Sequence, residues 1–193
     1  MRVFIIVLVL IFSLQSWTKA DDIRDFEIEG MSIGDSLLDY FSEEKIKNPD
    51  DFYKYKESDK FYHIIFNSIG KFDNITFTVK KNDTSYKIYQ VGGEIETLKI
   101  QDCHNLKKEI DKEIVQMFEN NVERHDIGSF KTSIDKTGKS LFYTIQYIFN
   151  SQDLIVLQCK DYSEEIGHPD SLLLDIATKE FDEWLSTEVY KYK

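Results

Sequence analysis

The sequence is poor in several residue types that mark common protein classes. Its 193 residues include only two Cys and two Pro, and 24 Lys and Arg stand against 35 Asp and Glu, for a net charge of −11. Nucleic acids and anionic lipids are bound through basic patches, so this acidic balance disfavours both as partners. The abundance of Lys, Ile, Asn, Asp, Phe and Tyr is typical of an AT-rich genome.

Motifs for catalysis and metal binding are also missing. The chain contains no G-x-S-x-G elbow, no H-E-x-x-H or H-x-x-x-H pair and no D-x-D-x-D-G calcium loop. Its four histidines are scattered, at His63, His104, His125 and His168. The sequence therefore predicts no catalytic residue, no cofactor and no metal site.

One short segment looks like part of a nucleotide-binding loop. Thr137–Ser140 reads Thr-Gly-Lys-Ser, but the first glycine of a phosphate loop would fall on Ser133. The aromatic and β-branched run Leu141–Phe149 predicts a strand, where a phosphate loop would need a helix. We therefore predict that Asp135–Gly138 is a hairpin turn, with Gly138 at positive φ.

The N-terminal residues have the pattern of a secretory signal peptide. Arg2 precedes the apolar run Phe4–Leu14, and small residues stand at −3 and −1 of a cleavage point after Ala20. A membrane anchor is the alternative, but a span needs about 20 apolar residues. No Cys lies near the cleavage point, which argues against a bacterial lipoprotein. We predict a signal peptide over residues 1–20 and one domain over residues 21–193, exported to the periplasm or secreted, without membrane insertion after cleavage.

The two cysteines, Cys103 and Cys159, allow only one intramolecular pairing. An exported chain meets oxidants, so we predict a disulfide between them. The bridge would tie the start of a helix to a strand, with Cα atoms about 4.4 to 6.8 Å apart. Two buried free thiols, or a Cys103 nucleophile working with a distant histidine, are the alternatives.

Three helices are predicted from apolar spacing and capping residues. The first begins at Ser32, whose hydroxyl and Asp35 resemble a capping box, and it ends at Asn48–Pro49. The second is capped by Asp102. The third opens at Pro169–Asp170. Its apolar face comprises Leu173, Ile176, Ala177, Phe181, Trp184 and Leu185.

Between the helices the apolar period changes to two, which indicates strands. Strands are predicted at Phe61–Phe66, Ile75–Lys80, Tyr86–Val91 and Glu94–Ile100, then as two strands following Gly128 and a third at Asp153–Lys160. Turns are predicted at Asp73–Asn74 and Asn82–Asp83, and a turn or a bulge at Gly92–Gly93. The order α-β(n)-α-β(3)-α predicts an α+β domain, with three helices packed on one face of an antiparallel sheet of about seven to eight strands.

Charged and aromatic pairs have two interpretations each. Adjacent acids occur at Glu43–Glu44, Asp50–Asp51, Glu164–Glu165 and Asp182–Glu183. Paired acids can hydrolyse glycosides or bind calcium, but such pairs are expected in an acidic chain and favour a solvated surface. Tyr53–Lys56 and Tyr190–Lys193 alternate Tyr with Lys. Stacking on single-stranded nucleic acid is one interpretation, and an edge strand and a frayed terminus are the favoured ones.

Several segments together resemble a family of small exported proteins from AT-rich bacteria. They are FEIEGMSIGDSLLDYFS, DKTGKS, LIVLQCKDYSEEI and EFDEWL. The resemblance covers most of the chain after the predicted signal peptide. It implies export and no particular activity, because that family is uncharacterised.

The sequence thus predicts an exported, periplasmic domain without catalysis that serves in binding or as an envelope accessory. Its expected partner is an unknown protein or small molecule. A hydrolase without a recognisable motif is the alternative. A pocket with convergent acids would favour the hydrolase. A free sheet edge or an apolar surface patch would favour binding.

Overall fold

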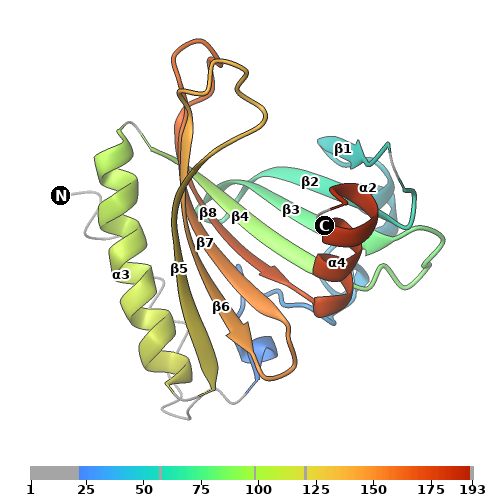
Figure 1. Cartoon of the computed structure of the whole chain (residues 1–193). Coiled ribbons are helices and arrows are strands. Elements are labelled where there is room, and N and C mark those ends of the chain that lie inside the picture. Colours follow the sequence, from blue (N-terminus) through green and yellow to red (C-terminus); the bar gives the residue numbers. More distant parts are fainter. Residues whose placement is uncertain (1–21, 57, 98, 120, 192–193) are drawn as a thin grey trace.

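The computed structural model describes residues 22–56, 58–97, 99–119 and 121–191. The predicted signal peptide, residues 1–20, lies outside these ranges. The described residues form one antiparallel sheet of eight strands in the order β1-β2-β3-β4-β8-β7-β6-β5. Helices lie on both sides of the sheet, α3 on one side and α4 on the other (Figure 1). The predicted α+β class and the strand number are confirmed, but the prediction that the helices pack on one face is wrong, because α4 packs on the side opposite to α3.

The bounds of the elements are as follows. The strands are β1 (Asp51–Lys54), β2 (Phe61–Ile69), β3 (Phe72–Lys80), β4 (Gln90–Thr97), β5 (Val122–Lys131), β6 (Leu141–Phe149), β7 (Leu154–Asp161) and β8 (Asp170–Ala177). The α-helices are α2 (Glu43–Lys47), α3 (Ile100–Phe118) and α4 (Lys179–Trp184). Short 3₁₀ turns cover Ile23–Asp25 and Leu37–Asp39, and a π-helical turn covers Leu185–Val189.

The sheet consists of two four-stranded meanders. Strands β1 to β4 form the first and β5 to β8 the second, and the two are joined where β4 pairs with β8. Helix α3 connects the meanders along the chain and runs lengthwise along the strands of the second one (Figure 1). The joining strands β4 and β8 therefore lie in the middle of the sheet.

The last predicted helix is wrong in its first half. Asp170–Ala177 forms β8, so the second meander has four strands and not three. A central strand has apolar side chains on both faces, and a short apolar run of this kind cannot be told from a buried helix by its period. The helix begins only at Lys179, after Thr178, whose hydroxyl accepts from the Phe181 backbone N–H at 3.3 Å.

The first predicted helix is also wrong at its start. Ser32 N–H does donate to the Asp35 carboxylate at 2.9 Å, but Gly34 takes φ 96°, which stops a helix there. The segment instead makes a 3₁₀ turn capped by Ser36 and then α2, capped by Ser42. The correct caps were thus four and ten residues further along the chain.

Two of the predicted turns lie inside strands. Asp73–Asn74 belongs to β3, and the hairpin turn is at Gly70 and Lys71. Gly92–Gly93 lies within β4, where a Cβ on Gly93 would collide with the Phe72 ring. These glycines permit close approach and do not make a turn. The predicted turn at Asn82–Asp83 is confirmed, with Asn82 at φ 64°.

Two element boundaries lie earlier than predicted. Helix α3 begins at Ile100 after Lys99, so Asp102 lies in the first turn and is not the cap. Strand β5 begins at Val122, and Gly128 lies within it at φ 73°. The register shifts at this point, which is a β-bulge closed by a 2.9 Å bond from Gly128 N–H to the Asp126 carboxylate.

The main core lies between α3, the N-terminal segment and one face of the sheet. Helix α3 buries Ile110, Ile114 and Phe118, and the Phe118 ring packs edge-on against Phe149 of β6 at 4.7 Å. Over β2 and β3 the same face is covered by the N-terminal segment, where Phe41 packs against Phe66 at 4.7 Å. We call this side of the sheet the apolar face.

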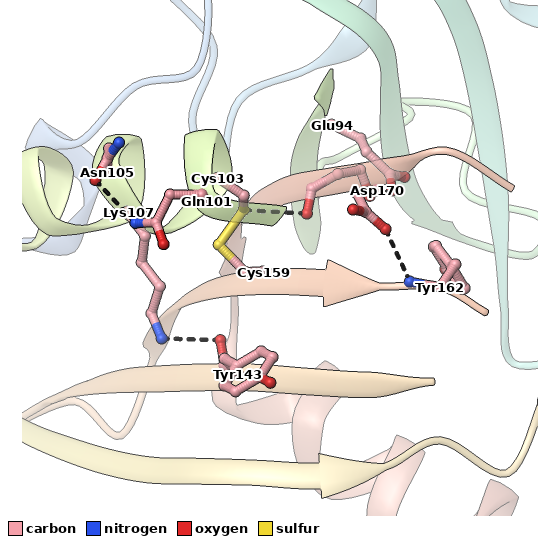
Figure 2. Close-up of a disulfide and its surroundings, with 10 residues drawn as sticks. Glu94, Gln101, Cys103, Asn105, Lys107, Tyr143, Cys159, Tyr162 and Asp170 are labelled. Atoms are coloured by element: carbon pink, nitrogen blue, oxygen red, sulfur yellow. Dashed lines mark hydrogen bonds between the residues drawn. A yellow bond between two sulfur atoms is a disulfide. The ribbon is translucent and has the colours of Figure 1, made fainter. Parts of the chain in front are cut away.

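The predicted disulfide between Cys103 and Cys159 is confirmed (Figure 2). Their Cα atoms are 5.9 Å apart, and both residues are fully buried on the apolar face. The bridge ties the first turn of α3 to β7, as expected. One turn later, the Lys107 ammonium donates to the Tyr143 carbonyl at 2.9 Å and ties α3 to β6. Because Cys103 is bridged, its thiolate is not available as a nucleophile.

Candidate functional site on the polar face of the sheet

The opposite side of the sheet carries buried polar side chains. Sheet register places His63, Thr78 and Gln90 directly across from one another on β2, β3 and β4, and directly opposed residues share a face. Asp175 of β8 lies across from Gly92 of β4, in the adjacent row. We call this side the polar face. Thr78 is 0% exposed and Gln90 6% exposed, so their polar groups depend on protein partners.

These side chains form a continuous hydrogen-bonded series, here called the polar chain. The Tyr55 hydroxyl lies 2.5 Å from His63 Nε2, and His63 Nδ1 lies 2.7 Å from Thr78 Oγ1. Thr78 Oγ1 donates to Gln90 Oε1, and Gln90 Nε2 donates to Asp175 Oδ1. The polar chain thus crosses from the segment after β1 to the middle of the sheet and ends at a carboxyl group.

The polar chain has one consistent direction of donation. Gln90 must donate its amide N–H to the Asp175 carboxylate, which leaves Gln90 Oε1 to accept from the Thr78 hydroxyl. Thr78 Oγ1 then accepts from His63 Nδ1–H, and His63 Nε2 accepts from Tyr55. This network assigns His63 as the neutral Nδ1–H tautomer, with every donor oriented toward Asp175.

Burial shifts the protonation equilibria along the polar chain. It raises the pKa of Asp175 to about 6, against weaker opposing effects of the Gln90 hydrogen bond and the Lys160 charge. Burial lowers the pKa of His63 to about 4, which agrees with the neutral tautomer. Burial also raises the pKa of the Tyr55 hydroxyl. Asp175 therefore titrates close to neutral pH while His63 stays uncharged there.

Gly92 makes the end of the polar chain possible. A Cβ on Gly92 would lie 2.5 Å from Asp175 Oδ1 and 2.9 Å from Gln90 Nε2. Only glycine therefore leaves space for the carboxylate to lie across β4 and reach the Gln90 amide. Gly92, one of the two glycines predicted to form a turn or a bulge, therefore belongs to the candidate site.

A second polar cluster lies beside the polar chain. Glu94 Oε1 accepts from the Lys160 ammonium at 3.0 Å and from the Ser171 hydroxyl. Burial opposes ionisation of Glu94, but the Lys160 charge and these hydrogen bonds outweigh it and lower the pKa of Glu94. Of the half-buried carboxyls on the polar face, Glu94 is neutralised by an ion pair, whereas Asp175 is held by the Gln90 amide.

Helix α4 covers one end of the polar face. Phe181 and Trp184 pack on Phe61, with the Trp184 ring 5.0 Å from that of Phe61. Tyr55 meets Trp184 edge-on at 4.9 Å, so the start of the polar chain is held against this aromatic cluster. Helix α4 thereby fixes Tyr55, while the carboxyl end of the polar chain remains half-buried at Asp175.

The other three histidines lie apart from the candidate site. His104 on α3 packs edge-on against Tyr143 at 4.7 Å, and His125 on β5 is 3.1 Å from Glu123. His168 lies in the loop before β8. In the part of the chain that the structure describes, no group of three or more His, Cys, Asp or Glu side chains is placed to hold a metal ion.

The adjacent acids that stood out in the sequence are spread over the surface. Glu43 is paired with Lys47, Glu165 with Lys139 and Glu183 with Lys179. Asp50 accepts from the Asn67 backbone N–H at 2.8 Å. The two half-buried carboxyls of the polar face, Asp175 and Glu94, belong to none of these pairs.

The segment that looks like a phosphate loop is a hairpin turn, as predicted. Gly138 has φ 69° and its N–H donates to the Asp135 carbonyl at 3.1 Å. The Asp135 carboxylate accepts from Thr137, Ser140 and Ser163, and the hydrogen bonds from Thr137 and Ser140 hold its pKa far below the usual range. The hydrogen bond from Ser163 joins the β5–β6 loop to the β7–β8 loop. The two loops project side by side beyond the sheet (Figure 1).

The two edges of the sheet differ in length. Among the described strands, β1 and β5 are the terminal ones, and β1 has four residues while β5 has ten. The edge interpretation of the Tyr53–Lys56 segment is confirmed for its first part, because β1 ends at Lys54. Along and just beyond β5, Ile127, Phe130 and Ile134 are 50%, 43% and 65% exposed.

Comparisons with known proteins assign this chain to no family. The chain matches no family model, no curated protein and no solved structure. Within the described ranges, no helix has the length and apolar character needed to cross a membrane.

Sequence reasoning missed the residues of the polar chain. Asp175 interrupts an apolar run that was assigned to a helix, and Gln90 lies beside two glycines that were assigned to a turn. A signal was present, because an acid inside an apolar run needs a partner if the run is buried. That partner, Gln90, lies 85 residues earlier in the chain, and only the pairing of β4 with β8 brings it close.

Proposed function

We propose that this protein is an exported, non-catalytic domain that binds a small polar ligand on the polar face of its sheet. The observation that supports this proposal best is the polar chain, which spans four strands and ends in the half-buried carboxyl of Asp175. Such a group costs folding free energy unless something compensates it. Carboxyl groups that carry such a cost and have a shifted pKa are concentrated at functional sites, so Asp175 is a candidate for a role in binding.

Binding on this face is testable by NMR with three defined probes. Glucose, acetate and ethanolamine should be titrated into ¹⁵N-labelled residues 21–193 at tens of millimolar. We expect at least one probe to shift amide signals of β3, β4 and β8 more than those of α3. If no probe shifts these strands, or if the shifts map to α3, the polar face is not the binding surface.

A hydrolase is the second candidate, and one observation favours it. Asp175 and Glu94 lie on neighbouring strands, and their pKa values are moved in opposite directions, as in many acid–base pairs. Release of 4-nitrophenol from 4-nitrophenyl acetate and from 4-nitrophenyl β-glucoside distinguishes the two functions. A binding domain should release no more than its Asp175→Asn variant. Turnover that depends on Asp175 would make the protein an enzyme.

A protein is the other class of partner expected for such a domain. Its binding surface would be the edge strand β5. An extended segment could pair with this strand beside the exposed Ile127, Phe130 and Ile134. Envelope extracts should be captured on wild type, on Ile127→Lys and on Phe52→Lys, which alters the other edge. A partner retained by Phe52→Lys and lost by Ile127→Lys would assign the β5 edge to protein binding.

Export is a separate part of the proposal. The signal pattern over residues 1–20 supports it, as does a buried disulfide, which suits an oxidising compartment. Intact mass of the protein recovered from the cell envelope should correspond to a chain that begins at Asp21. A mass that retains Met1 would contradict cleavage after Ala20.

A further inference from the structure

Strand β5 is one of the two terminal strands of the sheet, and its two halves differ. A β-bulge between Asp126 and Gly128 separates them. In the first half, Arg124 donates two hydrogen bonds to the Asp111 carboxylate of α3. In the second half, every residue from Gly128 to Lys131 is exposed. Within the described part of the chain β5 pairs only with β6, so its outer backbone N–H and C=O groups are open to another strand (Figure 1).

The side chains beyond the bulge differ between the two faces of the sheet. Phe142 of β6 lies across from Lys160 of β7, which places it on the polar face with the Glu94 cluster. Phe130 lies across from Phe142, and the two rings pack 6.0 Å apart on that face. Lys131 follows Phe130 and lies on the apolar face, because successive side chains of a strand alternate. A strand added at this edge would therefore meet an aromatic ring on one face and an ammonium group on the other.

The charge of this edge is positive, although the chain as a whole is acidic. From Gly128 to Ile134 the only charged residue is Lys131. Lys131 is exposed, and among the described residues it belongs to no ion pair. Lys136 in the adjoining loop is also exposed. The Asp135 carboxylate beside it is only 4% exposed and is hydrogen-bonded within the loops. Charge complementarity therefore favours an acidic partner at this edge.

Other pairings of the two terminal strands are less favourable. Two copies of this chain joined through the second halves of β5 would bring both Lys131 side chains to the same face, where like charges repel. The opposite edge, β1, carries Asp51 and Lys54, so its charges favour neither sign. An acidic extended segment is thus attracted more to β5 than to β1.

We propose that residues Gly128–Ile134 are the docking edge for an extended segment of another protein in which apolar and acidic residues alternate. The segment would extend the sheet through backbone hydrogen bonds, as in other strand additions. Its apolar side chains would lie beside Phe130 and its carboxylates beside Lys131. Ile134, which is 65% exposed, offers a further apolar contact just beyond the strand. This inference rests on the protein-binding function proposed for β5 and names the chemistry of the partner.

Two six-residue peptides serve as probes, one that alternates Val with Glu and one that alternates Val with Lys. Each should be titrated at millimolar concentration into ¹⁵N-labelled residues 21–193. We expect the Val-Glu peptide to shift the amide signals of Gly128–Lys131 saturably and to bind about fivefold more tightly than the Val-Lys peptide. A Val-Glu peptide with every amide N-methylated should not bind, because it lacks the donors that strand pairing needs.

Phe130→Ala and Phe52→Ala are matched variants, because Phe130 and Phe52 are both 43% exposed and lie on the terminal strands β5 and β1. Phe130→Ala should weaken Val-Glu binding about fivefold, whereas Phe52→Ala should change it less than twofold. Lys131→Glu should reverse the preference, so that the Val-Lys peptide binds more tightly. Amide spectra that are unchanged away from the substituted strand verify that the variants fold.

Equal binding of the two peptides, or equal losses in the two phenylalanine variants, would overturn the assignment. Wild-type dimers in sedimentation that disappear in Phe130→Ala would also overturn it, because the occupant of the edge would then be a second copy of this chain. If neither peptide binds while an envelope partner is still lost by Ile127→Lys, protein binding at β5 stands and the acidic segment is wrong.

Discussion

The two faces of the sheet are built on opposite principles. The apolar face is closed by α3, a disulfide and side chains such as Ile114 and Phe118, all of which stabilise the fold by leaving water. The polar face near α4 carries a chain of hydrogen bonds that ends in an acid with a raised pKa. Burial therefore stabilises the fold at the apolar face, whereas burial of the Asp175 carboxyl destabilises it at the polar face. The comparison suggests that the polar face has a role other than stability.

The largest expected effect comes from opening the apolar face at its disulfide. Replacing both Cys103 and Cys159 with Ala should lower the free energy of unfolding by about 4 kcal/mol, because the unfolded chain regains the entropy of a loop spanning 56 residues. Urea unfolding measures the loss. Reduced wild type should match the double variant, and an unchanged midpoint in reductant would mean that the bridge contributes little.

A cavity in the same face should have the next largest effect. Ile114 is 1% exposed within the α3 stripe, and Ile114→Ala should cost about 3 kcal/mol. The neighbouring Val115, which is 39% exposed, provides the control, since Val115→Ala should cost far less. Equal losses at the two positions would contradict the packing of α3 on the sheet.

On the polar face a substitution should have the opposite sign. The pKa of Asp175 is raised from 3.8 to about 6, so ionisation costs the folded state free energy as the pH rises through this range. Asp175→Asn should therefore stabilise the protein by about 3 kcal/mol at pH 7, and the gain should shrink to less than about 1 kcal/mol at pH 4. Urea unfolding at both pH values measures the difference.

His63 provides the reverse trend in the same pH range. Its pKa falls from 6.5 to about 4 on folding, so its contribution to stability is complete above pH 6.5 and is lost as the pH falls toward 4. In wild type, Asp175 and His63 change the free energy of unfolding with pH in opposite directions, so their effects partly cancel. In Asp175→Asn only the His63 effect remains, and stability should fall more steeply on acidification than in wild type.

The smallest effect is expected at a residue that belongs to neither face. Lys139 lies in the β5–β6 turn and pairs on the surface with Glu165. Lys139→Ala should shift the melting temperature by less than about 2 °C, as for ordinary surface changes. It should also leave the protein unable to bind ATP, like wild type. Wild-type ATP affinity that disappears in Lys139→Ala would restore the nucleotide-binding interpretation of Thr137–Ser140.

The apolar face was largely predictable from sequence, and the polar face was not. The disulfide, the α3 stripe and the strand of Ile75, Phe77 and Val79 follow from local spacing, because burial against one neighbour leaves a periodic pattern. The helix predicted at Ser32 failed at Gly34, where a positive φ overrides the apolar spacing. The local apolar period therefore predicts the residues of the apolar face. It does not predict positions such as Gly34, where the backbone takes a positive φ.

The polar chain depends on contacts between distant parts of the chain. Gln90 meets Asp175 only because β4 and β8 join the two meanders, and His63 meets Thr78 through the β2–β3 register. Neither pairing leaves a local signal. Asp175 also lies in a strand with apolar residues on both sides, a pattern that a buried helix shares. The residues of the candidate site could therefore be recognised only after the strand order was known.

The most direct test of the difference between the two faces is a pH titration of Asp175 and His63 by NMR. The ¹³C signal of the Asp175 carboxyl should titrate with a midpoint of about 6, and at pH 5.5 the His63 ring should be neutral with its proton on Nδ1. An Asp175 midpoint near 4, with His63 charged at pH 5.5, would mean that these groups are solvated like surface residues. That result would contradict the account of the polar face.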